Sequence, residues 1–285
     1  MSKAIGAGDP MGGSVKNRWR AFSSRHLLYE LVIKDIRVRY RRPILGFVWA
    51  FLTPLAMTGI LYLVFGRFLK IKIEEAPFLL YLTSALFTWR LFQDSLSAAT
   101  TSLYDNRALL RESRSPFYLF PLSIILVNTF VALPGYVLVI VLSAVQLHGL
   151  SWHVLLLPFV LAVHAAMTAA CSVIAALLYV RWRDIRYLIE TSLVFLFYAT
   201  PVFYSVNLVH ELLPAYAYRI YVYNPFTCIL TLYRVAFIKG YAVHVQDPAI
   251  VPCIIIAVVT AALLWASAVL LYRVNKKYVI EHVAY

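Results

Sequence analysis

Charged residues are scarce in this chain: they make up 14% of its 285 residues, and only 13 are Asp or Glu. A typical soluble domain is about 25% charged and about 45–50% apolar, whereas 62% of this chain is hydrophobic. A soluble fold of this size cannot bury that much apolar surface. The composition therefore excludes a disordered chain, a nucleic-acid-binding tail and a soluble enzyme core, and it predicts an integral membrane protein.

Cysteine and the common catalytic motifs are also rare or missing. Cys171, Cys228 and Cys253 lie far apart and outside any CxxC or His-partnered spacing, which argues against a disulfide framework or a zinc site. The ten glycines never take the GxxxxGK[ST] spacing, and GxGxxG, HExxH and GxSxG do not occur. We therefore predict no cofactor, metal or catalytic site in this chain, and no enzymatic activity of its own.

Long apolar runs take the place of these motifs. About 20 apolar residues are needed to cross about 30 Å of hydrocarbon. Six stretches qualify, at 44–66, 77–101, 117–147, 152–180, 187–204 and 248–272. A seventh run, 226–238, is too short to cross and is predicted to be a re-entrant helix within an external segment, 205–247. The fold class is thus an all-α membrane domain with six transmembrane helices over residues 43–275.

The chain has 26 basic and 13 acidic residues, and the basic residues are distributed unevenly between the two sides of the predicted spans. With a cytoplasmic N-terminus, ten Lys and Arg residues lie in 1–43 and three each in 102–116, 181–186 and 273–285, against six on the other side. The positive-inside rule then places both termini in the cytoplasm. The net charge of +13 is explained by topology and anionic lipid heads, so no nucleic-acid partner is predicted.

Residues 25–42 precede the first span and have helical periodicity with one apolar and one basic face. This pattern predicts an amphipathic helix in the cytoplasmic interface, ended by Pro43. The alternative is a basic stretch that only orients the chain. Residues 1–24 are expected to be mobile, and residues 276–285 to form a cytoplasmic tail.

The cytoplasmic loop at 102–116 is predicted to contain a short helix at 104–115. Asp105 or Asn106 is a candidate cap, and Pro116 would end the helix. Such a helix between two spans suits the binding of a soluble partner, whereas the alternative is a simple connector.

Two pairs of opposite charges fall within or beside the spans. Arg90 and Asp94 are one helical turn apart, as are Arg186 and Glu190. Ionisable groups in lipid often contact substrate or carry protons. The alternative is that each pair neutralises itself and faces a protein interior, which the absence of a longer relay favours.

Aromatic residues are abundant, with 20 Tyr, 17 Phe and 6 Trp. Some belong to the interfacial belts of the membrane. Tyrosine also stacks on sugar rings and bonds their hydroxyls, so the excess suits either a glycan-binding surface or ordinary membrane packing.

Four segments in order resemble the ABC-2 type permeases, specifically the membrane subunits of bacterial polysaccharide exporters for O-antigen, capsule or teichoic acid. They are 39–54 (RYRRPILGFVWAFLTP), 106–122 (NRALL to PL), 183–204 (RDI to PVFY) and 213–234 (LP, YNPF and YR). The Arg41-Arg42-Pro43 turn departs from the more polar turn of many members, which leaves the subfamily open.

The resemblance implies two copies of this chain and two copies of a separate ATPase that binds ATP and Mg²⁺, in the bacterial cytoplasmic membrane. It implies a polyprenyl-diphosphate-linked glycan as substrate, O-antigen first, with teichoic acid, capsule or a small lipid or drug as alternatives. A membrane glycosyltransferase or acyltransferase, and a non-transporting scaffold, are the alternatives of another class.

The same resemblance assigns roles to residues of this chain. The ATPase-coupling residues are Asn106, Arg107, Leu109, Leu110, Arg111 and Glu112. A basic collar for the diphosphate comprises Arg37, Arg39, Arg41 and Arg42. Aromatic residues implied to line the glycan path are Trp49, Tyr62, Phe65, Phe195, Tyr198, Phe203 and Tyr204.

Overall fold

The computed structural model describes residues 12–39, 43–71, 73–74, 76–112, 116–241 and 249–283. Within these ranges the regular elements are all helical. They are α1 (Gly12–Arg39), α2 (Pro43–Leu61), the π-helix η1 (Tyr62–Phe68), α3 (Phe78–Asp105), α4 (Arg107–Glu112), α5 (Leu119–Gln146), the 3₁₀-helix η2 (Trp152–Leu156), α6 (Leu157–Arg181), α7 (Ile185–Ala199), α8 (Val206–Leu212), α9 (Ala215–Val222), α10 (Pro225–Phe237) and α12 (Ile250–Val283).

Three helical segments in the described ranges are long and apolar enough to cross a membrane: Leu119–Gln146, Trp152–Arg181 and Ile250–Val279. Their outward faces are apolar as well. On α5, for example, Val137, Val141 and Val145 are exposed one turn apart, as expected for a stripe that contacts lipid. The prediction of a helical membrane fold is confirmed, whereas the count of six spans stays a prediction.

Helix α3 is long but more polar than these three, and its position explains why. It contacts α2, α5, α6, α7 and α10, and its buried residues run from Leu80 to Leu103. Its hydroxyl groups bond within the helix, as when Thr88 Oγ1 donates to the Ser84 carbonyl at 2.9 Å. A helix that is enclosed by protein and whose hydroxyl groups are bonded in this way does not need a lipid-facing stripe.

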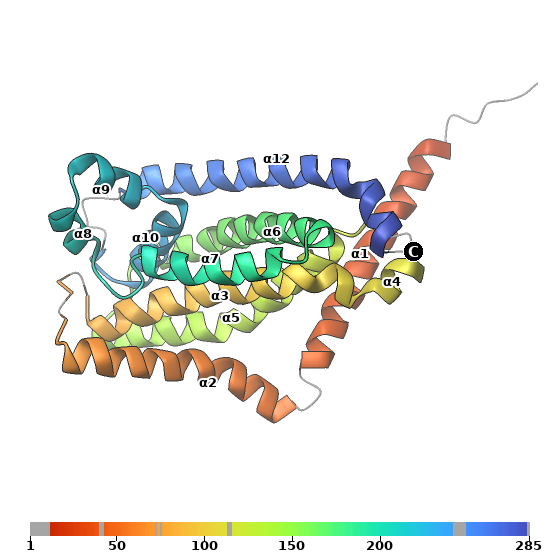
Figure 1. The fold of residues 1–285 in the computed structure, drawn as a ribbon. Coiled ribbons are helices and arrows are strands. Elements are labelled where there is room, and N and C mark those ends of the chain that lie inside the picture. The colour runs from red at the N-terminus through yellow and green to blue at the C-terminus, as the bar shows by residue number, and fades with distance from the viewer. Residues whose placement is uncertain are drawn as a thin grey trace, which may run out of the picture.

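The two ends of the bundle differ (Figure 1). Helices α1 and α4 lie with the last turns of α12 at one end, the α4 end, whereas α8 and α9 lie at the other, the α9 end. An apolar cluster that includes Leu31, Leu110 and Val279 joins α1, α4 and α12. The bundle therefore brings α1, α4 and the last turns of α12 together at one end, whereas the side of the membrane on which they lie stays a prediction.

Helix α10 is short but deeply buried, because it packs against α3, α6 and α12. Asn224 Oδ1 caps its first turn by accepting from the Phe226 backbone N–H at 2.9 Å, and Pro225 occupies the first helical position. All but its first two residues are buried. The predicted re-entrant helix is thus a helix of the protein core near the α9 end.

The ends of several elements differ from the prediction. Helix α1 begins at Gly12, earlier than the start expected at Arg25. The first long hydrophobic helix changes to π-helix at Tyr62, a change that the apolar pattern does not contain. Helix α7 ends at Ala199, directly before Thr200-Pro201, because a residue that precedes proline disfavours helical geometry.

Gly135 permits the close packing of α5 on α3, because a Cβ at this position would overlap the ring of Phe87. We expect Gly135→Ala to lower the thermal unfolding temperature, since overpacking costs about 1–3 kcal/mol. Gly59→Ala is the matched control, because a Cβ there meets nothing within 4 Å. Thermal denaturation of the purified protein in detergent measures both, and equal stability of the two variants would contradict this packing.

Candidate functional site

Helix α4 is a short element that presents one face to the bundle and one outward. Leu110 is buried at 6% exposure in the cluster at the α4 end, and Leu109 is half-buried beside it. Arg107 and Arg111, one turn apart, are exposed. The side chain of Glu112 lies outside the described residues. The helix is therefore anchored through leucine and displays two arginines on its outer surface.

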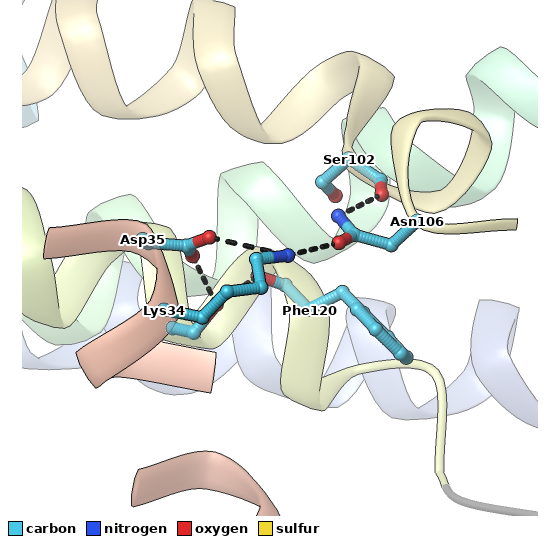
Figure 2. A network of polar contacts seen from close by, with 6 residues as sticks. Lys34, Asp35, Ser102, Asn106 and Phe120 are labelled. Carbon is cyan, nitrogen blue, oxygen red and sulfur yellow. Dashed lines mark hydrogen bonds and ion pairs between the residues drawn. The ribbon is translucent and has the colours of Figure 1, made fainter. Parts of the chain in front are cut away.

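A polar network connects α4 to α1 (Figure 2). Lys34 Nζ donates to Asn106 Oδ1, and Asn106 Nδ2 donates to the Ser102 carbonyl at 2.8 Å. Asp35 accepts a hydrogen bond from Ser123 Oγ at 3.0 Å and lies 3.4 Å from Lys34 Nζ. Two consecutive residues of α1 thus bind the residue before α4 and the first turns of α5.

This network gives Asn106 a role that differs from the expected cap. Its backbone N–H bonds to the Ser102 carbonyl at the end of α3, and its own carbonyl accepts from the Leu110 N–H at 3.0 Å in α4. Asn106 is therefore the joint between α3 and α4, and its side chain holds α1. Nothing in the local pattern of the loop identifies Lys34, Asp35 or Ser123 as members of the network, because all three lie outside the loop.

The basic collar is described only in part. Arg37 lies on α1 one turn beyond Lys34, and it is exposed. The side chain of Arg39, and Arg41 and Arg42 as a whole, lie outside the described residues. The collar therefore stays a prediction.

Most of the proposed path aromatics meet near the α9 end. The ring centroids of Phe65 and Phe203 are 5.0 Å apart, and those of Tyr198 and Phe203 are 5.9 Å apart. Tyr204 lies beside Phe203, with centroids 5.2 Å apart, whereas Tyr62 stacks on Phe78. Phe195 projects from the outer face of α7 and is 72% exposed. The side chain of Trp49 lies outside the described residues.

The tyrosine hydroxyls around this aromatic group form a chain. Tyr221 Oη donates to Tyr204 Oη at 2.8 Å, and Tyr204 Oη donates to the Tyr198 carbonyl at 2.9 Å. Burial, followed by this bond, raises the pKa of Tyr221 above its ordinary value. Tyr221 therefore remains a protonated donor at physiological pH.

The sequence assigned no role to Arg234, which counted among the external basic residues and stood in the YR pair of the family resemblance. Its side chain is completely buried in α10, and Nη2 donates to the carbonyls of Pro201 and Val202 at 2.6 and 3.1 Å. A signal was present, because a lone arginine inside an apolar run is the pattern of an intramembrane functional group.

Both charge pairs within the helices are close enough to interact. Arg90 Nε lies 3.7 Å from Asp94 Oδ2, and Arg186 Nε donates to Glu190 Oε1 at 2.9 Å. Their side chains are between a third and a little over half exposed. Each pair therefore forms along one helix, although its side chains are not enclosed by the single chain. A role of these residues in contacting substrate or carrying protons stays a prediction.

Comparison with known protein families assigns this helical chain to a family of membrane proteins. The model of the ABC-2 type transporter family matches residues 26–238, from α1 through α10. The chain belongs to this family. It is an integral membrane transport subunit, not an enzyme.

Two curated proteins are similar to the chain over most of its length. One is the O-antigen export system permease protein RfbA of Myxococcus xanthus, 28% identical over 247 residues, or 87% of this chain and 92% of that protein. Another is the O-antigen export system permease protein RfbA of Klebsiella pneumoniae, 25% identical over 229 residues, or 80% and 86% of the two chains. The similarity covers almost the whole length of these relatives.

Proposed function

We propose that this chain is the channel-forming permease subunit of an ATP-driven exporter in the bacterial cytoplasmic membrane. Its substrate is a polyprenyl-diphosphate-linked polysaccharide, with O-antigen as the first candidate. Two copies of the chain form the channel, each with six spans and both termini in the cytoplasm. Two copies of a separate ATPase, which binds ATP and Mg²⁺, supply the energy.

The observation that carries the proposal is the structure of the α4 end. Helix α4 is anchored by Leu110, displays Arg107 and Arg111, and is joined to α1 through Lys34 and Asn106. An exposed basic helix at the cytoplasmic end is suited to bind a soluble partner, and the contact with α1 connects that partner to the membrane interface. A permease without a Walker A motif needs such a partner for ATP hydrolysis.

The substrate class is supported by the relatives and by the aromatic group near the α9 end. Both similar proteins carry the name of O-antigen export permeases. Phe65 of η1 and Phe203 of the turn after α7 lie together, and aromatic faces bind the C–H faces of sugars. Phe195 and Tyr198 are exposed on α7 of the single chain, where a second copy and the path between the copies would cover them.

Co-purification with the ATPase is the direct test. We expect the complex to hydrolyse ATP and a lipid-linked glycan to stimulate the turnover. A chain that associates with no nucleotide-binding subunit would overturn the proposal. An ATPase gene beside this one among O-antigen, capsule or teichoic-acid genes would assign the glycan.

Assays on the same complex distinguish a glycan exporter from a permease for a small lipid or drug and from a membrane transferase. Replacement of Phe65 and Phe203 by alanine should reduce export of a glycan. Unchanged surface glycan in this variant would favour a permease for a small lipid or drug. Sugar or acyl transfer without ATP would favour a membrane transferase instead.

A further inference from the structure

Arg234 is a cation enclosed in the membrane domain. Its exposure is 0%, and no described carboxylate lies within ion-pair distance of it. A buried charge without a counter-ion is strongly unfavourable unless other groups replace its hydration. The groups that surround Arg234 therefore indicate what the residue does.

Those groups belong to two other parts of the chain. Nη2 binds the carbonyls of Pro201 and Val202, and Cζ lies 3.4 Å from the centre of the Tyr81 ring of α3. Tyr81 Oη in turn donates to the Tyr204 carbonyl at 2.9 Å. One arginine and one tyrosine thus hold three of the four carbonyls in the turn 201–204. A guanidinium suits this task because its planar fork binds oxygen in a fixed direction.

Stability alone is a poor explanation for this arrangement. Nε and Nη1 of Arg234 are buried and have no hydrogen-bond partner among the described residues, so the desolvation of the guanidinium is only partly compensated. Even a buried ion pair can often be replaced by apolar residues with no loss of stability. The contacts supply a defined geometry for the turn.

The turn that Arg234 holds carries Phe203. This residue lies between the bound carbonyls of Val202 and Tyr204, and its ring is 5.0 Å from Phe65 of η1. Helix α7, which precedes the turn, packs on the core through Leu193, its one buried residue, and through half-buried Phe197, whose ring lies 5.7 Å from that of Trp89. The hydrogen-bonded turn adds a polar attachment at this end of α7 to the apolar contacts of the helix.

We propose that Arg234 is a positioning residue, which lies outside the glycan path and fixes Phe203 against Phe65. In this way Arg234 determines the geometry of the aromatic surface that binds the glycan. The inference rests on the proposed function for the identity of the substrate. The positioning itself is independent of the substrate.

The experiment measures the distance between positions 65 and 203. Phe65→Cys and Phe203→Cys are combined in a chain with Cys171, Cys228 and Cys253 replaced by alanine, and a short thiol cross-linker is applied to the complex with its ATPase. Mass spectrometry of the monomer-sized band detects links within one chain. Arg234→Met should lower the ratio of linked to unlinked protein about tenfold, because bonds from a charged donor are lost.

The matched control is Thr231→Val. Thr231 is a buried residue of the same helix whose hydroxyl has no hydrogen-bond partner in the described structure, so cross-linking should not change. Arg234→Lys should restore part of the loss, because an ammonium keeps the charge without the fork. Full cross-linking in a folded Arg234→Met protein would overturn the proposal.

A second variant keeps the test decisive if Arg234→Met does not fold. Tyr81→Phe removes only the hydroxyl bonded to the Tyr204 carbonyl, and it should lower cross-linking by a smaller factor, while an unchanged yield would overturn the proposal. Arg234-dependent cross-linking, together with a complex of the unsubstituted chain whose ATP turnover does not respond to lipid-linked glycans, would support the positioning and reject the proposed substrate.

Discussion

Reversal of Arg107 and Arg111 to glutamate is expected to abolish export while the protein still inserts and folds. Both residues are exposed on α4, whereas Leu110 anchors the opposite face. Like charges brought together at an interface cost several kcal/mol, so two reversals should weaken ATPase binding at least about 100-fold. Co-purification of the ATPase and surface glycan measure the effect.

The control for this prediction reverses two other basic residues at the same end. Arg273 and Lys276 are exposed on α12, and their replacement by glutamate changes the net charge by the same amount. This control should retain the ATPase. Normal export by the α4 variant, or equal loss in both variants, would contradict the assignment of α4 as the coupling helix.

Replacement of Lys34 by methionine is expected to separate ATP hydrolysis from export. The change removes the contacts with Asn106 and Asp35 but leaves the outer face of α4 intact. The ATPase should therefore bind and turn over. Export per ATP should fall about tenfold, because a hydrogen bond from a charged group contributes about 1.5–3 kcal/mol.

A double-mutant cycle identifies the contact responsible. Lys34→Met and Asn106→Ala should be no more harmful together than Asn106→Ala alone, because each change breaks the same bond. Arg25→Met is the control, since it removes an exposed cation from the same helix. Additive losses, or unchanged export per ATP in Lys34→Met, would show that the contact between Lys34 and Asn106 does not couple ATP hydrolysis to export.

The local signals in the sequence describe several helices well. The apolar runs at 117–147, 152–180 and 248–272 become the long apolar helices, because length and hydrophobicity are properties of the run itself. The start of α10 follows from Asn224 and Pro225 for the same reason, since a cap and a first-turn proline act within one turn.

The contacts of the site do not follow from local signals. Lys34 meets Asn106, and Arg234 meets Pro201, across long intervals of the chain. The sequence marks Arg234 as a cation in an apolar run, but its burial depends on how α3, α10 and the turn after α7 pack. Pairing of this kind is decided by the packing of helices and not by any pattern within one helix.

The sequence by itself determined that this chain is a helical membrane protein of the ABC-2 family, because composition, apolar run length and short motifs are local properties. Only the tertiary structure decided which polar groups meet. Lys34 and Asn106 connect α1 to α4, and Arg234 holds the turn beside Phe203. The physical reason is that a buried polar group needs hydrogen-bond partners, and the packing of the helices, not the local sequence, determines which groups are close enough to serve.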